Sequence, residues 1–190
     1  MRMLLLKHFD FDDPSYFISW AGQHEAELTI LFPPNGFHAP AMDSFDLMII
    51  LGGPMSAYQD NEYPWLQSEK AFIREAVESG RKVLGICLGA QMLAEVLGGR
   101  VYRSPHKEIG WHQVKRNGTQ HPLLEGVPDD FYSFHWHGDC FDIPPGGGFT
   151  GFVGSMQASG VYLWRTRSWS SIPSGNDGRL HDDDAGEMAA

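Results

Sequence analysis

The sequence predicts one α/β domain with three layers, in which helices cover both faces of a mostly parallel sheet. Short apolar runs of strand length alternate with longer stretches of helical period, the pattern typical of a parallel sheet. The run at 46–51, Asp-Leu-Met-Ile-Ile-Leu, is almost wholly apolar, as expected of a central strand buried on both faces. With 190 residues, 42% of them hydrophobic, the chain is long enough for one well-buried domain and short for two.

The first half of the chain supplies three strands and two helices. Strands are predicted at 3–6, 26–31 and 46–51. A first helix starts at Asp12-Asp13-Pro14, since proline is tolerated in the first turn of a helix. Its apolar face consists of Tyr16, Phe17, Trp20 and Ala21. A second helix at 61–80 ends at glycine and turns inward Trp65, Phe72, Ile73 and Val77.

The second helix leads to a strand, a cysteine and a third helix. The strand is the apolar run 83–86, and the helix begins at Gly89 and stops at Gly98-Gly99. Cys87 lies between them with Gly85 and Gly89 two residues to either side, the spacing of a nucleophile elbow. The helix N-terminus behind Cys87 is expected to lower the pKa of its thiol. The alternative is a buried structural cysteine at the end of a strand.

Two further strands are predicted beyond this unit, at 100–102 and 109–114, and they are followed by one last motif, at 131–139. The last contains two histidines, His135 and His137, followed by Gly138 and Asp139. Two histidines suggest metal ligation, but the sequence offers no third ligand at a sensible spacing. We therefore predict neither a metal nor another cofactor.

Residues 85–91, Gly-Ile-Cys-Leu-Gly-Ala-Gln, resemble the nucleophile motif of class I glutamine amidotransferases. The resemblance is strongest to the glutaminase domain of GMP synthase and its stand-alone relatives. It runs from about Met3 to Pro145 and includes several motifs in the family's order. It implies a flavodoxin-like fold and hydrolysis of the glutamine side-chain amide through a thioester on Cys87.

The resemblance also implies the other site residues. Gly52-Gly53-Pro54 resembles the family's oxyanion loop, in which the backbone N–H of Gly53 would act with that of Leu88; alone, the triplet could be a plain turn. The glutamine site would be shaped by Gln91, His137, Gly138 and Asp139. In relatives, a segment like Gly110-Trp111 lines the glutamine pocket, although a half-buried strand explains it equally well.

Composition limits the partners. The net charge of −10 and the lack of a Lys/Arg cluster exclude nucleic-acid binding. Two cysteines, Cys87 and Cys140, indicate a reducing compartment, and no run has the character of a signal peptide or membrane span. We expect a cytoplasmic protein that binds glutamine or a γ-glutamyl small molecule. The resemblance adds a separate ammonia-accepting synthase subunit as a possible partner.

The likeness stops after Pro145, which divides the chain into a family-like part, 1–145, and a foreign tail, 146–190. The family supplies its catalytic base from a Gln-Phe-His-x-Glu segment after a late strand, and the tail has none. Its only late pairing is His181 with Glu187, in an acidic stretch without strand character. We therefore expect an incomplete domain whose C-terminal part is missing or disordered, with exposed sheet edges.

We predict that a shift of reading frame at Gly146-Gly147-Gly148 created this tail. Codons built from the last two bases of each tail codon and the first base of the next permit Gln-Phe-His-Leu-Glu across residues 171–176. The alternative is a genuine extension. With the base lost, glutaminase activity would be impaired; the other functional readings are a γ-glutamyl peptidase-like hydrolase and a catalytically dead domain that binds glutamine or a partner.

Overall fold

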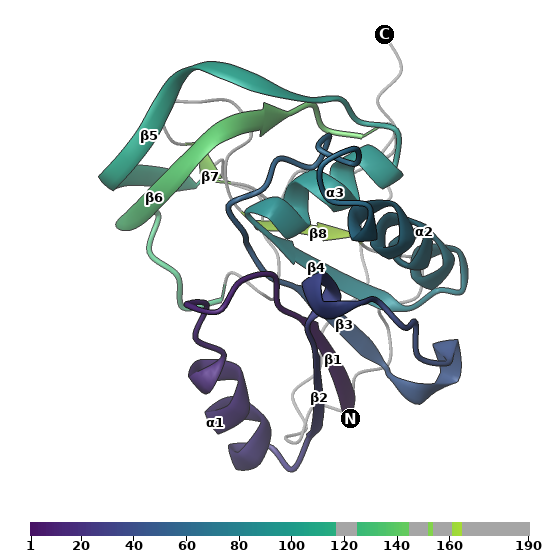
Figure 1. Cartoon of the computed structure of the whole chain (residues 1–190). Coiled ribbons are helices and arrows are strands. Elements are labelled where there is room, and N and C mark those ends of the chain that lie inside the picture. Colours follow the sequence, from purple (N-terminus) through teal and green to yellow (C-terminus); the bar gives the residue numbers. More distant parts are fainter. Residues whose placement is uncertain (117–124, 145–151, 154–160, 165–190) are drawn as a thin grey trace, which may run out of the picture.

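The computed structural model describes residues 1–116, 125–144, 152–153 and 161–164, and it contains two sheets. The central sheet has the strand order β2-β1-β3-β4-β8, and the smaller one has the order β6-β5-β7. Figure 1 shows the smaller sheet at the upper left of the view, to one side of the central sheet. Within the described residues, no helix is long and apolar enough to cross a membrane.

The central sheet is mostly parallel, as the sequence predicts. Its parallel strands are β1 (Arg2–Leu6), β2 (Glu27–Leu31), β3 (Leu47–Ile50) and β4 (Lys82–Ile86). The strand predicted to be central, β3, is the middle one, and its side chains are buried except for the partly exposed Leu47. Because parallel strands end at the same edge of a sheet, the segments after β1, β3 and β4 meet there.

Alternating side chains of these strands supply two apolar clusters on opposite faces of the sheet. Leu4, Leu6, Met48 and Ile50 face α2 (Trp65–Glu78) and α3 (Leu88–Val96). Met3, Leu5 and Ile49 face α1 (Ser15–Gln23). Figure 1 shows α1 and the α2–α3 pair on the two sides of the sheet. This arrangement confirms the predicted three-layer architecture.

The two helices before Cys87 differ in detail from the prediction. In α1 only Ala21 is buried, whereas Tyr16 is 73% exposed, because this short helix packs beside β1 and the edge strand β2. The second helix begins at Trp65 and not at residue 61. Pro64 precedes its first turn, a position in which the missing N–H of proline costs nothing.

The smaller sheet is antiparallel and is built on one long strand. The two strands predicted at 100–102 and 109–114 are a single strand, β5 (Val101–Arg116). Its pairing with β6 (Asp130–Phe141) shifts register between Arg103 and Glu108. Pro105 lies in this interval, and its missing N–H cannot contribute to the ladder.

The tail was expected to be irregular, and most of it lies outside the described residues. Where it is described, it forms strand instead: β7 (Phe152–Val153) pairs with β5. The second strand, β8 (Val161–Trp164), pairs antiparallel with β4 and so covers an edge of the central sheet expected to be exposed. The expectation of irregular chain is wrong for these six residues.

Candidate active site

Cys87 lies on a sharp turn between β4 and α3, as the sequence predicts. Its backbone has φ 53° and ψ −110°, a conformation that side chains rarely adopt and that lifts this residue out of the strand. The flanking glycines make the turn possible. A Cβ on Gly85 would lie 2.5 Å from the carbonyl oxygen of Gly89, and a Cβ on Gly89 would overlap the carbonyl group of Ile50.

Two backbone N–H groups, those of Leu88 and Gly53, face the Cys87 sulfur and favour its thiolate. Burial nevertheless dominates and, together with the charge of Asp139, raises the pKa of the Cys87 thiol above its ordinary value of 9.0. The prediction of a lowered pKa is therefore wrong for this structure. The helix terminus contributes as expected, but it is outweighed by the loss of solvent around the sulfur.

The loop after β3 places Gly52 and Gly53 next to the Cys87 turn. A Cβ on Gly52 would lie 3.4 Å from the Cβ of Cys87. A Cβ on Gly53 would lie 2.9 Å from Cδ2 of Leu88 and 3.1 Å from Cβ of His8. A side chain at position 53 would therefore have to displace Leu88 and His8, whereas one at position 52 would make ordinary contact with Cys87.

A buried pair that sequence reasoning did not find, His8 and Glu69, holds this loop in place. Nδ1 of His8 lies 2.9 Å from the carbonyl oxygen of Gly52, and Nε2 lies 3.0 Å from Oε1 of Glu69. A carbonyl oxygen can only accept, so Nδ1 donates. Burial lowers the pKa of His8, but its hydrogen bond and Coulombic attraction to Glu69 outweigh burial and raise it. The contact with Glu69 therefore favours the protonated form of His8.

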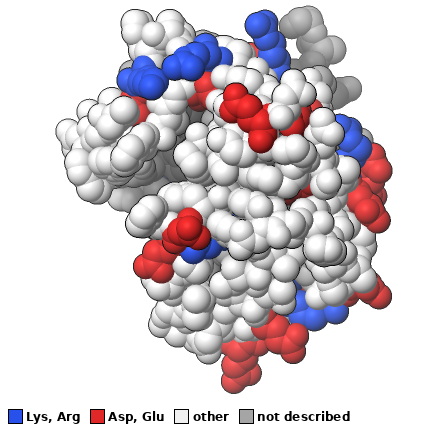
Figure 2. Space-filling model, in the orientation of Figure 1, with Lys and Arg blue, Asp and Glu red and all other residues white. Residues whose placement is uncertain are grey.

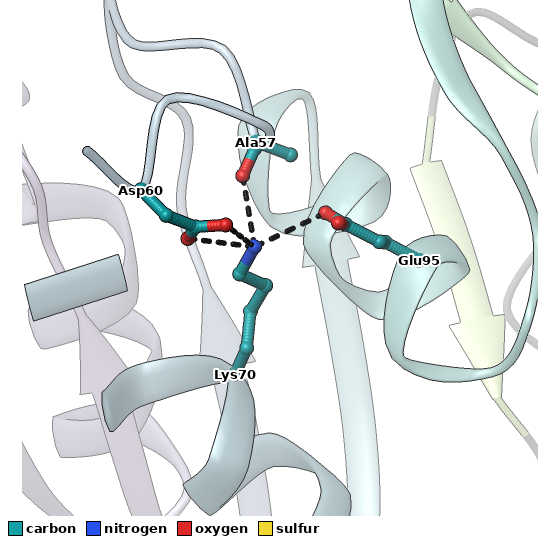
Figure 3. A network of polar contacts seen from close by, with 4 residues as sticks. All are labelled: Ala57, Asp60, Lys70 and Glu95. Carbon is teal, nitrogen blue, oxygen red and sulfur yellow. Dashed lines mark hydrogen bonds and ion pairs between the residues drawn. The ribbon is translucent and has the colours of Figure 1, made fainter. Parts of the chain in front are cut away.

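A second polar network ties the same loop to the helix behind Cys87 (Figure 3). Lys70 of α2 lies 2.8 Å from both carboxylate oxygens of Asp60 and donates to the carbonyl oxygen of Ala57 at 3.0 Å. It also lies 3.3 Å from Oε2 of Glu95 on α3. The ammonium is largely buried, so these contacts restrain the loop and the helix relative to each other.

A pocket of about 270 Å³ opens over Cys87, between the central sheet and the β5–β6 strands. It brings together predicted site residues from three parts of the chain: Gly53, Cys87, Gln91, His137, Gly138 and Asp139. Leu88 contributes its N–H behind the sulfur, and its side chain is buried in the core. Gly110 and Trp111 are not among the described lining residues, and Trp111 is 71% exposed, as in the half-buried strand alternative.

The pocket wall contains polar groups suited to an amino acid. Oδ2 of Asp139 accepts from the Ser56 hydroxyl at 2.5 Å, and Oδ1 accepts from the Tyr58 hydroxyl at 3.2 Å. Gln91 is 6% exposed, and its Oε1 has no hydrogen-bond partner among the described residues. A buried acceptor of this kind is costly unless a ligand donates to it.

Two cations that the sequence did not single out, Arg103 and Lys107, also line the pocket. Both lie on β5, in the interval where its pairing with β6 shifts. The sequence carries no motif around them, and only the meeting of the two sheets brings them over Cys87. They give the pocket positive charge opposite Asp139, which suits a ligand with both a carboxylate and an amino group.

The third metal ligand that the sequence lacked is present in space. Glu108 of β5 lies within ion-pair distance of both His135 and His137 on β6. Imidazole nitrogens and a carboxylate are common metal ligands, so this cluster could hold a metal ion. The late pair His181 and Glu187 lies outside the described residues. Among the described ones, no imidazole is hydrogen-bonded to Cys87.

The charged surface carries no large basic area on the face displayed. Figure 2 shows Lys and Arg side chains in small groups, with Asp and Glu side chains beside them. This agrees with the net charge of −10. The surface shown gives no groove of the kind that phosphate backbones require.

The chain is similar to several known proteins. A family model described as glutamine amidotransferase class-I matches residues 23–156. The glutamine amidotransferase-like protein YfeJ of Salmonella typhimurium is 37% identical over 133 residues, covering 67% of this chain and 52% of that protein. A glutamine-hydrolyzing GMP synthase of Thermomicrobium roseum is 42% identical over 100 residues, covering 52% of this chain and 18% of that protein.

The fold is also similar to that of a solved structure. A glutamine amidotransferase from Thermotoga maritima matches with a TM-score of 0.71 at 35% identity, covering 76% of this chain and 63% of that one. The chain thus spans about half the length of YfeJ and less than a fifth of the GMP synthase.

Proposed function

The chain belongs to the class I glutamine amidotransferase family, and from that premise we propose that residues 1–145 form a glutaminase-type site for the side-chain amide of glutamine. The observation that carries the proposal is the Cys87 turn. Its sulfur lies at the base of a pocket, with the N–H groups of Leu88 and Gly53 directed at it. This is the arrangement needed to attack a carbonyl carbon and to stabilise the resulting oxyanion.

In the proposed reaction, the Cys87 thiolate attacks the amide carbon of glutamine, and the carbonyl oxygen takes up negative charge. The N–H groups of Gly53 and Leu88 donate to this oxygen. When the intermediate collapses, the C–N bond breaks and the nitrogen takes a proton to leave as ammonia. The γ-glutamyl thioester on Cys87 then reacts with water, which releases glutamate and restores the thiol.

The backbone end of glutamine would be held by the opposite wall of the pocket. Arg103 and Lys107 supply positive charge for the α-carboxylate. The carboxylate of Asp139 and the unpaired Oε1 of Gln91 can accept from the α-ammonium group. His137 and Gly138 line the same wall and shape it. These assignments follow from charge and position, and they extend the roles that the family resemblance implies.

Turnover is expected to be slow in this chain. Cysteine chemistry of this kind uses an imidazole to generate the thiolate and to protonate the departing nitrogen. The family's Gln-Phe-His-x-Glu segment is absent from the sequence. Burial moreover raises the pKa of Cys87, so that the thiol form predominates at neutral pH. The proposal is therefore a glutamine site with impaired catalysis.

Two alternative functions and one partner are also compatible with this site. The same nucleophile could cleave a γ-glutamyl amide other than glutamine, as a γ-glutamyl peptidase does, or the domain could bind glutamine without reacting. Since a GMP synthase is among the relatives, we propose a separate synthase as the acceptor of any ammonia released.

The test combines binding with ammonia release. Glutamine should slow iodoacetamide labelling of Cys87, and any ammonia released should disappear in Cys87→Ala. Protection without ammonia release would indicate the binding domain, and preferential cleavage of γ-glutamyl dipeptides would indicate the peptidase. If neither glutamine nor a γ-glutamyl dipeptide protects Cys87 or is hydrolysed, the proposed function is wrong.

A further inference from the structure

We infer that Glu108, His135 and His137 form a binding site for a divalent transition-metal ion such as Zn²⁺. The sequence does not suggest it, because Glu108 lies 27 residues before His135. In the sheet, however, Glu108 is directly opposite His137 in the register of β5 and β6. His135 lies two residues earlier on β6 and therefore projects from the same face of the sheet.

The residue opposite His135 is Gly110. With no side chain at that position of β5, the His135 ring can lean along the sheet toward Glu108. Its Nδ1 lies 2.7 Å from Oε2 of Glu108. Nε2 of His137 lies 3.2 Å from the same oxygen, so both rings converge on one carboxylate atom.

The cluster is largely buried, which makes the two ring nitrogens of His137 costly if they stay without a partner. The side chains of Glu108, His135 and His137 are 4%, 11% and 12% exposed. Among the residues that the structure describes, neither ring nitrogen of His137 has a hydrogen-bond partner of good geometry, in spite of the short distance to Glu108. An imidazole nitrogen that is buried without a partner loses its hydrogen bonds to water and gains no other bond in the protein. A bond to a metal ion would replace them.

The spacing of the donor atoms suits a first-row metal ion. One atom from each residue can be chosen so that all three lie within 4.8 Å of one another. Bonds of about 2.0–2.2 Å in a tetrahedral site place ligand atoms about 3.3 Å apart. The nitrogens lie 2.7 and 3.2 Å from the oxygen, so small side-chain rotations would admit the ion.

The ligand types select the class of metal. Two imidazoles and one carboxylate suit Zn²⁺, Co²⁺, Ni²⁺ or Fe²⁺, whereas Mg²⁺ and Ca²⁺ prefer oxygen ligands alone. Three protein ligands leave a coordination position for water or another ligand. Because His137 also lines the pocket over Cys87, the ion would lie in the wall of that pocket. The competing interpretation is a metal-free ion pair that only joins the two strands.

The experiment measures Co²⁺ and Zn²⁺ binding to the full chain carrying Cys87→Ala, which removes the most accessible thiolate ligand. We expect one ion per chain and a cobalt spectrum without a thiolate charge-transfer band. His135→Gln and His137→Gln should each weaken binding more than about a hundredfold, since even outer-shell partners are worth 10–100-fold. His112→Gln is the matched control. The ring of His112 stacks on that of His135, with centroids 5.1 Å apart, but His112 is not in the cluster. This variant should therefore bind the metal ions normally.

A second measurement needs no change to the cluster. Electron paramagnetic resonance of the Cu²⁺-loaded chain counts the coordinated imidazole nitrogens, and two are expected. Failure of the chain to bind Co²⁺ or Zn²⁺ stoichiometrically would overturn the inference. So would affinity unchanged in the His135→Gln and His137→Gln variants, or a copper spectrum with fewer than two imidazoles. None of these readouts depends on glutamine, so this inference can fail while the proposed function stands.

Discussion

Glu69 and His8 form a fully buried pair against the loop that carries Gly52 and Gly53, with 3.0 Å between Oε1 and Nε2. The other nitrogen of His8 donates to the carbonyl of Gly52, one residue before the proposed oxyanion donor Gly53. The imidazole also stacks on Trp65 with ring centroids 5.5 Å apart. The pair therefore connects α2 to the loop at which charge develops in the proposed reaction.

The pair makes stability depend on pH. Because the folded-state pKa of His8 is raised above 6.5, its contribution is fully present below pH 6.5. It is lost as pH rises through the higher folded-state pKa. Glu69→Gln should remove this part of the slope and lower the free energy of unfolding at pH 6 by about 1–3 kcal/mol. Urea unfolding of both proteins at a series of pH values measures it.

Glu75→Gln is the control, since Glu75 lies exposed on the same helix. It should change the free energy of unfolding by no more than about 0.5 kcal/mol and leave the pH slope alone. A Glu69→Gln variant with the wild-type slope would show that His8 is not the titrating group.

The glycines of the Cys87 turn should be irreplaceable. Gly89→Ala would press a methyl group against the backbone of Ile50, so we expect a loss of about 3 kcal/mol or more in the free energy of unfolding. Gly22→Ala in α1 meets no atom within 4 Å and should be neutral or stabilise by about 0.5–1 kcal/mol. Equal effects in the two variants would contradict the tight approach of α3 to β3.

Cys87 should be alkylated faster than Cys140 despite its raised pKa. Cys87 is partly exposed in the pocket, whereas Cys140 is buried and its pKa is also raised by burial. Labelling of Cys87 by iodoacetamide should therefore be slow at pH 7 and rise about tenfold per pH unit toward pH 9. Peptide mapping after timed labelling distinguishes the two sites. Labelling of Cys87 that is already maximal at pH 7 would indicate a base near the sulfur.

The cations of the pocket should govern affinity for glutamine. Arg103→Met and Lys107→Met remove charge while keeping length, and calorimetric titration should show weaker glutamine binding in each, by about 1–3 kcal/mol. Arg74→Met, an exposed cation on α2, is the control and should bind normally. Unchanged affinity in both pocket variants would assign the α-carboxylate to other groups.

What could be predicted from the sequence was local. The Cys87 turn depends on glycines two residues away, and β3 depends on its own apolar run, so short-range patterns suffice for both. The missed features join distant residues. Sixty-one residues separate His8 from Glu69, and only strand register places Glu108 opposite His137. The pKa of Cys87 was misjudged for the same reason, since burial depends on the whole pocket wall.

The last prediction concerns the gene. If the tail arose by a frame shift near Gly146, the nucleotide sequence must encode Gln-Phe-His-Leu-Glu in the frame one base later, across residues 171–176. The genetic code already constrains this. Tryptophan has the single codon TGG, so Trp164 and Trp169 must each become a glycine codon in that frame, whatever the other bases are. The third base of most other codons is free, so agreement at any single residue is weak support. The support comes from a long run of residues that agree in one frame and in the family's order.

Sequencing the gene across codons 144–177 decides the matter. The histidine codon must straddle Pro173 and Ser174, and the glutamate codon must straddle Gly175 and Asn176. A stop codon before this point, or another residue in place of either one, would rule out the frame shift and leave a genuine extension. If the motif is there, restoring the frame returns an imidazole and its carboxylate to a site that already holds a cysteine and two proposed oxyanion donors. Glutaminase turnover should then rise by at least about a hundredfold over the present chain, because general acid–base catalysis contributes 10²–10⁴-fold.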